Sequence, residues 1–247
     1  MLNDNINKII AKFKFFLLFP YIARDYFNFK GKLIKNRGFK MSWFNLQPII
    51  NEKSLSTSFD RHYIYHPAWA ARIIAQNKPE EHIDISSILS FSSIISAFVP
   101  VCFFDYRPAD IELSNLSCGH ADLLNLPFKD NSVKSLSCMH TVEHIGLGRY
   151  GDPLDPDGDL KAMKELSRVL APGGSLLFVV PVGRPKIYFN AHRIYSYQQV
   201  VSSFDGLILK EFSLISEKNG GLVVNATENN VAKEKYACGC FWFTKLK

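Results

Sequence analysis

The chain has 247 residues, of which 47% are hydrophobic and 21% charged, as expected for one α/β domain with a modest appendage. Its net charge of +6 is local, because residues 1–40 carry nine basic and two acidic side chains while the other 207 carry 20 basic and 21 acidic ones. This distribution excludes a nucleic-acid-binding body with basic grooves throughout, so we expect no nucleic-acid partner.

The five cysteines form no C-x-x-C pair and have no neighbouring histidine at metal-ligand spacing. No secretory signal is visible either. These features predict a reducing, cytoplasmic location and no metal site.

The N-terminal segment interleaves bulky apolar residues with lysines at helical spacing over residues 6–35. This pattern predicts a basic amphipathic helix, which either packs on the main domain or lies on the inner face of a membrane through residues 1–40. The apolar run at 15–23 is too short to span a bilayer, and Pro20 interrupts it. Residues 37–60 have the composition of an irregular linker, so we expect an extension over 1–60 and an α/β domain over 61–247.

The domain is expected to open with a helix that begins near Pro67 and ends before Pro79. Short apolar runs then alternate with helical patterns, which is typical of a mostly parallel sheet. A closing antiparallel pair with a long insertion between its strands is expected at the C-terminal end. The expected strands are 82–86, 101–107, 132–139, 175–182, 207–216 and 236–246, and the expected helices include 92–98 and 158–170.

Acidic residues stand at the ends of the early strands, where an open α/β sheet binds its ligands. Asp105 follows Asp84 by about 20 positions, the spacing at which a carboxylate accepts hydrogen bonds from ribose hydroxyls. Asp122 precedes the next strand, where its carboxylate or a neighbouring amide can meet the amine of adenine. Each acid alone is more typical of a turn, but the three in order favour a bound adenosine group.

The ordered strings "HIDISS", "FFDYRP", "LPFKD" and "RVLAPGG" resemble the class I S-adenosylmethionine-dependent methyltransferases. More narrowly, "HIGLGRYGDPLDPDGD" with "FNAHRIYS" is similar to domain-of-unknown-function family 268, and the resemblance extends over about residues 20–215. It implies a Rossmann-like α/β sandwich that binds S-adenosylmethionine, and the bacterial relatives imply a glycan-linked substrate.

Carried over residue by residue, the methyltransferase pattern assigns the cofactor site. The resemblance implies that Asp84, Ser86 and Ser87 surround the methionine group and that Asp105 with Tyr106 binds the ribose. It likewise implies that Asp122 with Leu123 contacts the adenine and that His140 lies beside the sulfonium. The chain departs from the pattern at Ser86, where a glycine is expected. A side chain there either obstructs the cofactor or hydrogen-bonds to it.

Methyl transfer to a hydroxyl group needs alignment and a general base. The string "HTVEHIG" follows a strand end that faces the cofactor site and supplies Glu143 and His144, while "FNAHRIYS" supplies His192. We expect His144 or His192 to accept the proton, with Glu143 orienting an imidazole. The alternative is that these histidines only hold their loops by bonding to the backbone.

The loop 143–159 contains a literal G-x-G-x-x-G at Gly146, Gly148 and Gly151. A dinucleotide loop joins a strand directly to a helix, and here the helix is delayed to about Gly158, so we interpret the loop as a wall of the acceptor pocket. The acids of "GDPLDPDGD" fail the calcium-loop pattern. Asp157 or Asp159 is expected to cap the helix, and an assisting magnesium ion is the minor alternative.

Three functions follow from these patterns. The first is S-adenosylmethionine-dependent O-methylation of a sugar or cell-surface glycan, including a lipid-linked one, in polysaccharide biosynthesis. The second is a non-catalytic binding domain of the same fold, which Ser86 favours. The third is another glycan-modifying enzyme that uses the His/Gly-rich loop itself. The patterns leave the oligomeric state open.

Overall fold

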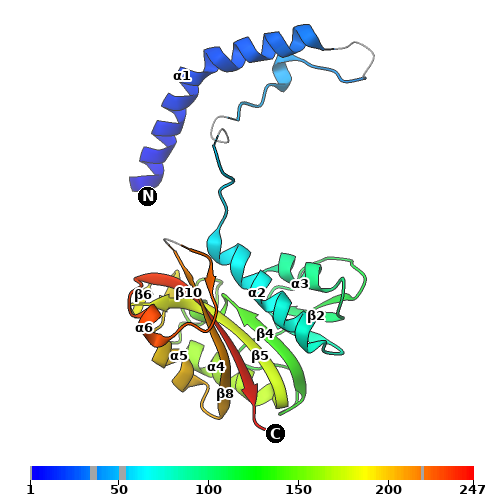
Figure 1. Ribbon diagram of the computed structural model, residues 1–247, viewed down its shortest axis with the longest axis vertical. Helices are drawn as coiled ribbons and strands as arrows, with labels where there is room; N and C mark the ends of the chain where they lie inside the picture. Colours follow the sequence, from blue (N-terminus) through cyan, green and yellow to red (C-terminus); the bar gives the residue numbers. More distant parts are fainter. Residues whose placement is uncertain (1, 34–37, 50–53, 218–219) are drawn as a thin grey trace. The chain divides into compact units, whose positions relative to one another are not determined.

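The computed structural model describes residues 2–33, 38–49, 54–217 and 220–247, with side chains from Phe15 onward. The chain divides into two compact units, Met1–Ser58 and Phe59–Lys247 (Figure 1). Two expected segments lie partly outside the described residues. These are the C-terminal end of the N-terminal helix, at 34–35, and the linker, at 37 and 50–53.

The described residues of the first unit include a long helix, α1 (Leu2–Lys32), and a 3-10 turn, η2 (Trp43–Asn45). The helix continues through Pro20. The Trp43 ring stacks on Phe27 with centroids 5.6 Å apart and meets Tyr26 edge-on at 5.1 Å, which anchors the turn to the helix. Among the described residues, no helix is long and apolar enough to cross a membrane.

The second unit is built on an eight-stranded sheet in the order β3-β2-β1-β4-β5-β10-β8-β9. The first five strands in this order run parallel, β10 pairs antiparallel with both β5 and β8, and β9 pairs antiparallel with β8. The mostly parallel sheet with an antiparallel closing pair is therefore confirmed. The strands are β1 (His82–Ile85), β2 (Val101–Asp105), β3 (Leu116–His120), β4 (Val133–Met139), β5 (Leu170–Gly183), β8 (Leu207–Ser216), β9 (Leu222–Val223) and β10 (Tyr236–Lys245), and a separate hairpin is formed by β6 (Lys186–Tyr188) and β7 (His192–Ile194).

Helices cover both faces of this sheet, because side chains of the buried strands alternate between two apolar cores (Figure 1). On β5, Leu176 and Phe178 face the core of α4 and α5, whereas Leu177 and Val179 face the core of α2 and α3. Helix α2 is amphipathic in the same sense, with Trp69 buried on the sheet side. The helices are α2 (Arg61–Asn77), α3 (Leu89–Ile95), α4 (Gly158–Val169), α5 (Tyr197–Ser203) and α6 (Glu228–Val231), and η3 (Val142–His144) is a 3-10 turn.

Three helix predictions need correction. Helix α2 begins at Arg61 and not near Pro67, because the Asp60 carboxylate caps it by accepting from the Tyr63 amide at 3.1 Å, and Pro67 lies inside it. Helix α3 begins at Leu89, three residues before the expected start at 92. Asp157 occupies the N-cap position of α4, but its side chain makes no cap hydrogen bond.

Several short elements were not expected. Strand β3, "LSCGH", is brief and contains Gly119, where a Cβ would lie 2.8 Å from the Phe104 ring. The β6–β7 hairpin and α5 also lack a long periodic pattern, although Ser196 and Gln199 form a capping box at the start of α5.

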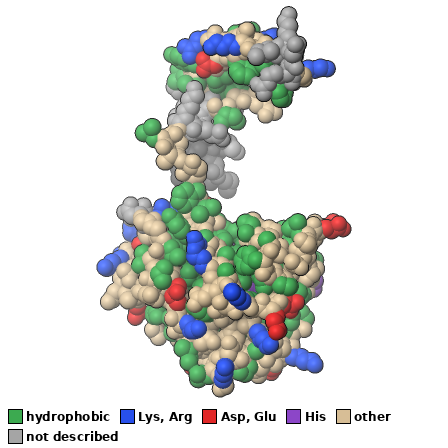
Figure 2. Space-filling view, turned by 45° about the vertical axis from the view of Figure 1, so that its right-hand side comes forward, with side chains coloured by type: hydrophobic (Ala, Val, Ile, Leu, Met, Phe, Trp, Pro, Cys, Tyr) green, Lys and Arg blue, Asp and Glu red, His purple; other side chains and the backbone are tan. Residues whose placement is uncertain are grey.

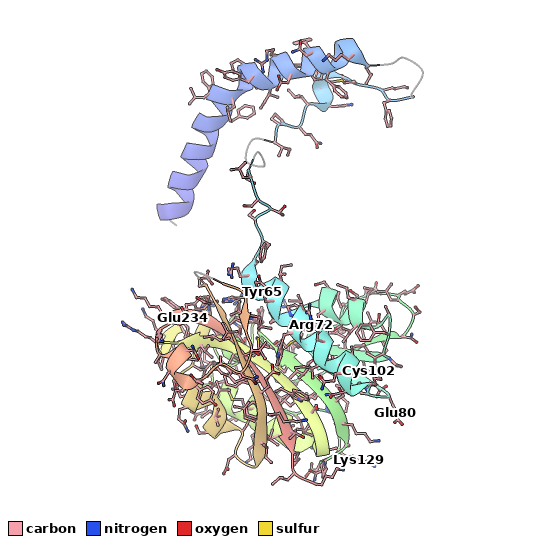
Figure 3. The ribbon with its side chains drawn as sticks, in the orientation of Figure 1. Tyr65, Arg72, Glu80, Cys102, Lys129 and Glu234 are labelled. Carbon is pink, nitrogen blue, oxygen red and sulfur yellow. The ribbon has the colours of Figure 1, made fainter. Side chains whose placement is uncertain are left out.

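The surface of the second unit agrees with its near-neutral charge. Figure 2 shows Lys and Arg side chains scattered among other residues over the face in view. Figure 3 shows two residues of α2, Tyr65 and Arg72, on the helix that crosses in front of the sheet, and Arg72 is exposed. Charge is therefore not concentrated on this face.

Candidate functional site

A pocket of about 170 Å³ opens at the carboxyl ends of the parallel strands β1, β2 and β4. This is the edge at which open α/β sheets bind ligands. Its walls come from the turn after β1, the end of β2, the segment after β3, and the loop that follows β4. The lining residues are Ser86, Asp105, Tyr106, Arg107, Ala121, Asp122, Leu123, Leu124, His140, Thr141, His144, Ile145, Gly146, Tyr150, Asp152 and Pro153.

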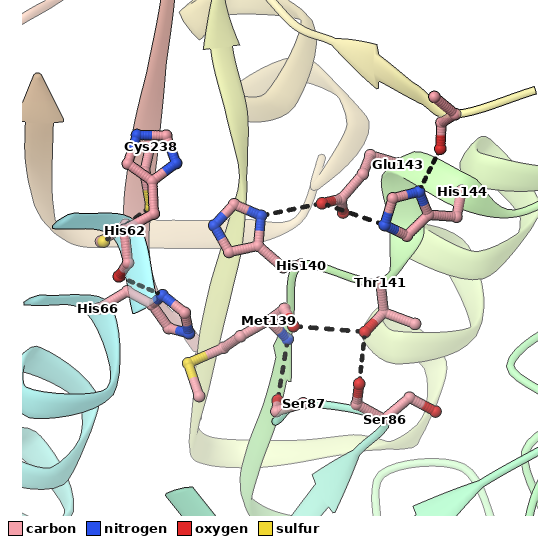
Figure 4. Close-up of polar contacts among 12 residues, drawn as sticks. His62, His66, Ser86, Ser87, Met139, His140, Thr141, Glu143, His144 and Cys238 are labelled. Atoms are coloured by element: carbon pink, nitrogen blue, oxygen red, sulfur yellow. Dashed lines mark hydrogen bonds and ion pairs between the residues drawn. The ribbon is translucent and has the colours of Figure 1, made fainter. Parts of the chain in front are cut away.

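The turn after β1 carries Ser86 in the left-handed region, at φ 54°. Its amide donates to the Phe104 carbonyl at 2.7 Å, and the Thr141 hydroxyl donates to the Ser86 carbonyl at 2.8 Å (Figure 4). Thr141 therefore ties the ends of β1 and β4 together. A glycine would adopt this backbone conformation without strain, so the position has the geometry of the expected glycine but carries a side chain.

Asp84 and Ser87 face the interior and do not line the pocket. The buried Asp84 carboxylate accepts hydrogen bonds from the Ser137 hydroxyl at 2.5 Å and from the Ser92 hydroxyl. Ser87 is also buried, and its hydroxyl accepts from the Met139 amide at 3.1 Å (Figure 4). Both residues therefore stabilise the turn from the interior of the domain and do not face the pocket.

The ribose and adenine predictions fall on residues that do line the pocket. Asp105 uses one carboxylate oxygen to accept from the Arg107 amide at 2.8 Å, and Asp122 likewise accepts from the Leu124 amide at 2.9 Å. In each carboxylate the second oxygen has no partner among the described residues. Tyr106 and Leu123 lie in the same walls and supply aromatic and apolar surface.

His140 also has a left-handed backbone, at φ 56°, and its ring is joined to Glu143. Its Nδ1–H donates to Glu143 Oε1 at 2.9 Å (Figure 4). Glu143 is only 1% exposed, and its Oε2 has no hydrogen-bond partner. A buried carboxylate beside two histidines favours the charged form of each imidazole.

His144 lies on the same carboxylate. Its Nδ1 is 2.6 Å from the Ala191 carbonyl, so Nδ1 carries the hydrogen and Nε2, which is 3.8 Å from Glu143 Oε1, is left with a lone pair. Burial lowers the pKa of His144 below its ordinary value, which keeps the ring neutral near pH 7. The Arg149 guanidinium lies 3.4 Å from the same Nε2, and a neutral imidazole whose lone pair meets only this weak contact is suited to accept a proton.

His192 does not line the pocket. It comes from β7, and its ring centroid is 6.5 Å from that of His144 and 5.8 Å from that of Tyr236. Burial lowers its pKa as well, and its Nε2 is buried without a partner. The structure thus brings His144 and His192 together, but only His144 faces the pocket.

The glycine loop is held tightly by one carboxylate. Asp152 Oδ2 accepts from the amides of Gly146 at 2.9 Å and Gly148 at 3.3 Å, and Asp152 Oδ1 accepts from the Tyr150 amide at 3.1 Å. All three glycines of the G-x-G-x-x-G string have positive φ. The loop therefore forms a rigid wall of the pocket and does not join a strand to a helix.

A buried arginine fixes the far end of this loop. Arg193 donates to the Ile145 carbonyl at 2.7 Å and to the Pro156 carbonyl at 3.2 Å, and its Nε lies 3.5 Å from Asp159 Oδ2. The Tyr195 hydroxyl donates to the same Asp159 oxygen at 2.8 Å. Asp159 is therefore engaged inside the domain and is not a helix cap, whereas Asp157 holds the N-cap position without a side-chain hydrogen bond.

Sequence reasoning missed four pocket residues that matter to its shape. Thr141 links the two strand ends, Asp152 holds the loop, and the Arg107 guanidinium lies 4.9 Å from the centre of the Tyr150 ring, between opposite walls. The aspartate directly after the third glycine was a usable signal, since an Asx side chain often accepts from nearby amides. The Arg107–Tyr150 contact joins segments far apart in sequence and had no such signal.

Residues 127–238 match the family described as "Caenorhabditis protein of unknown function, DUF268". We refer to these residues, which make up less than half of the chain, as the DUF268 region. The matching family model is the one that the sequence predicts, although the match begins later than the expected residue 20 and extends beyond 215. The DUF268 region contains the glycine loop and both predicted general bases, whereas the turn after β1 and Asp105 precede it. No curated protein sequence matches the chain.

Solved structures place the α/β domain that contains the DUF268 region in the class I methyltransferase fold. A candidate methyltransferase from Bacillus halodurans has a TM-score of 0.53 at 15% identity, covering 73% of this chain and 99% of its own. The N-methyltransferase NodS from Bradyrhizobium japonicum, solved with S-adenosyl-L-homocysteine, has 0.53 at 13%, covering 73% and 86%. The [4+2]-cyclase SpnF has 0.50 at 11%, covering 73% and 81%. The fold prediction is confirmed, and the cyclase shows that the fold alone does not fix the reaction.

Proposed function

We propose that this protein is an S-adenosylmethionine-dependent methyltransferase that transfers the methyl group to a hydroxyl of a sugar or cell-surface glycan. One observation carries the proposal: a single pocket at the ligand-binding edge of a methyltransferase fold brings Asp105 and Asp122 together with His144. The two acids suit the adenosine part of the cofactor, and the histidine suits proton transfer from an acceptor.

The residues fit the adenosine half of the cofactor. Asp105 and Asp122 each keep one carboxylate oxygen for a new hydrogen bond, and Leu123 and Leu124 provide apolar surface beside them. The volume of about 170 Å³ lies below the roughly 300–1,000 Å³ of ordinary small-molecule sites. Binding the whole cofactor therefore requires an outward movement of exposed wall residues such as Tyr106 and Tyr150.

S-Adenosylmethionine supplies an electrophilic methyl group on a sulfonium, so the protein mainly has to align donor and acceptor. His144 Nε2 accepts the proton of the acceptor hydroxyl. Glu143, 3.8 Å from the same nitrogen, stabilises the imidazolium that results. The glycine loop, fixed by Asp152 and Arg193, holds His144 at the pocket wall and limits the room for the acceptor.

Calorimetry with S-adenosylmethionine and S-adenosylhomocysteine tests the cofactor part of the proposal. We expect both to bind the wild-type chain, and Asp105→Ala to weaken binding by about tenfold or more, because a hydrogen bond to a charged group is lost. Asp110→Ala is the matched control, since Asp110 is an exposed acid in the next loop. Absence of binding to the wild type would refute the proposal.

The acceptor part is tested by following labelled methyl groups into isolated lipid-linked and free polysaccharide fractions. We expect incorporation into a glycan hydroxyl, and His144→Ala to lower kcat by about 100-fold or more while cofactor affinity is unchanged. Incorporation that is equal in His144→Ala would remove this residue from the reaction.

A non-catalytic domain of the same fold is the second candidate. Ser86, with its side chain at the position of the expected glycine, and the small pocket favour it. This candidate predicts that neither cofactor form binds and that no acceptor is methylated, so the same two experiments separate the two functions.

A further inference from the structure

A cluster of histidines and cysteine lies on the other side of His140 from Glu143, between three elements that are distant in sequence. His62 comes from α2, His140 follows β4, and Cys238 comes from β10 (Figure 4). One ligand atom from each of the three residues lies within 4.8 Å of the others. The His62 and His140 side chains are about 95% buried, at 6% and 5% exposure, and Cys238 is fully buried.

Two imidazole nitrogens at this cluster lack a hydrogen-bond partner, one on His140 and one on His66, whose ring centroid lies 5.0 Å from that of His140. His66 Nε2 and His140 Nε2 are buried and form no hydrogen bond, whereas His62 Nε2 lies 3.1 Å from the Glu217 carboxylate. Buried polar atoms in folded proteins nearly always have a partner. Two such nitrogens on neighbouring rings therefore indicate room for a ligand at this cluster.

The opposite nitrogens of two of these rings are already fixed. His140 Nδ1 donates to Glu143 at 2.9 Å, and His66 Nδ1 donates to the His62 carbonyl at 2.7 Å. In the neutral form of each ring, this arrangement leaves Nε2 with a lone pair directed away from the fixed side. Histidines that bind metals are commonly oriented in this way, by a carboxylate or a backbone carbonyl on the second nitrogen.

We propose that His62, His140 and Cys238 bind one zinc ion. Two imidazoles and a thiolate form a donor set for a borderline-soft metal of tetrahedral preference, and they do not suit magnesium or calcium, which prefer oxygen ligands. Ligand atoms around tetrahedral zinc lie roughly 3.3–3.8 Å apart, so the three side chains close by about 1 Å when the ion binds. Cys238 binds as thiolate, and its proton leaves to solvent.

Three protein ligands leave a fourth coordination position. His140 also lines the pocket at the strand ends, so the ion lies close to that pocket, behind the His140 ring. The chain contains no C-x-x-C pair, and the expectation of no metal site rested on linear spacing. The fold brings the ligands together from three elements, which spacing does not reveal. This inference is independent of the proposed methyl transfer.

Metal content and cobalt spectroscopy on the full chain test the site. We expect the purified protein, after exposure to zinc, to retain one ion per chain, and the cobalt-substituted protein to show a thiolate-to-cobalt charge-transfer band in the near ultraviolet. Cys238→Ser should abolish that band and lower the zinc affinity, and Glu143→Ala should lower it by about 10- to 100-fold by releasing the His140 ring.

Cys138→Ser is the matched control, because Cys138 is equally buried but belongs to the opposite core. It should keep both the stoichiometry and the band. Circular dichroism reports whether each variant folds, and the wild-type cobalt spectrum decides the question even if Cys238→Ser does not fold. A wild-type cobalt complex without the thiolate band, or full zinc retention by folded Cys238→Ser, would overturn the proposal.

Discussion

Asp84 is a buried acid whose carboxylate accepts hydrogen bonds from serine hydroxyls, one of which also bonds to His82. Ser137 donates to its carboxylate and in turn lies 2.9 Å from His82 Nε2, while His82 Nδ1 lies 2.8 Å from the Ser135 hydroxyl. The network joins β1 to β4 beneath the pocket. Burial raises the pKa of Asp84 to about 6, against which the serine hydrogen bonds act, and nearby Asp105 adds to the rise.

This pKa predicts a pH-dependent stability. The folded chain holds the Asp84 proton up to about pH 6, whereas the unfolded chain releases it near the ordinary value of 3.8. The folded state therefore binds more protons in this interval, and the free energy of unfolding falls by about 3 kcal/mol as pH rises through it. Asp84→Asn cannot ionise, so its stability relative to wild type should rise from about pH 4 to pH 6.5.

Urea unfolding of the two chains at each pH measures this difference. His82, whose pKa burial lowers to about 3, produces the opposite slope, but both chains contain it and its contribution cancels. A stability difference that does not vary with pH would show that the Asp84 carboxylate is ionised throughout.

Ser86 allows a second prediction at the residue scale. Its φ of 54° is unfavourable for a residue with a Cβ, so Ser86→Gly should stabilise the protein by about 1 kcal/mol, even though the weak hydroxyl contact to Phe104 at 3.3 Å is lost. Ser87→Gly is the contrast, because it leaves the buried Met139 amide without its acceptor and should destabilise by about 1–3 kcal/mol. Thermal unfolding of both variants is the measurement. Equal effects of the two substitutions would contradict the assignment of backbone strain to Ser86 and of a stabilising hydrogen bond to Ser87.

The sequence predicted the pocket acids because strand ends lie at one sheet edge whatever the details of packing. Asp105 and Asp122 therefore line the pocket. Asp84 occupies an equivalent strand end, but its side chain turns inward to Ser92 and Ser137. Those partners come from α3 and β4, and no local pattern marks them as neighbours of Asp84.

At the scale of elements, the glycine loop depends on one close approach. A Cβ on Gly146 would lie 2.0 Å from the Asp155 carbonyl oxygen, whereas a Cβ on Gly151 would meet nothing within 4 Å. Both residues have positive φ, so they form a matched pair.

We expect Gly151→Ala to cost about 1 kcal/mol of stability from backbone strain alone. Gly146→Ala adds a steric clash and should cost about 2–4 kcal/mol, or shift the loop that carries His144. Urea unfolding gives the two values, and the rate of methyl transfer shows the effect on His144. Similar losses for the two alanines would mean that the loop relaxes around residue 146 freely.

Long periodic elements were predictable and short ones were not. The helix at 158–169 and the core of the strand at 175–182 match expectation, because burial against a sheet imposes their pattern, although β5 begins earlier, at Leu170. The β6–β7 hairpin has only three residues per strand, and its first strand is exposed, so no burial pattern exists to be detected. Helix α2 begins directly after its N-cap residue, Asp60, and continues through Pro67, so the cap and not the proline sets the first residue of this helix.

At the scale of the whole molecule, the two units differ in their surfaces. The second unit buries most of its apolar residues in two cores, although single ones such as Phe189 and Leu154 are exposed. In the first unit, Phe15–Leu18 are four consecutive exposed apolar side chains, with Phe16 79% exposed, and Phe27 and Phe29 are exposed as well. Apolar residues at four successive positions surround the helix instead of forming one stripe, which differs from the expected amphipathic pattern.

Exposed aromatic residues combined with a local charge excess suit an anionic lipid surface. Residues 1–40 carry nine basic side chains against two acidic ones. Each basic residue near such a surface contributes about 1 kcal/mol, and this attraction weakens with added salt. We therefore expect the full chain to sediment with vesicles containing anionic lipid, less so with neutral vesicles or at high salt, and not after removal of residues 1–40.

Two full-length variants separate the contributions to this binding. Replacing Lys8, Lys12 and Lys14 with glutamine removes charge, and replacing Phe16 and Leu17 with serine removes exposed apolar area. Both should reduce sedimentation with anionic vesicles, but only the serine variant should also reduce the residual binding to neutral vesicles, since that binding has no charge term. Equal sedimentation of the chain lacking residues 1–40 would assign membrane contact to the second unit, and a lipid-linked acceptor would then have to be reached from there.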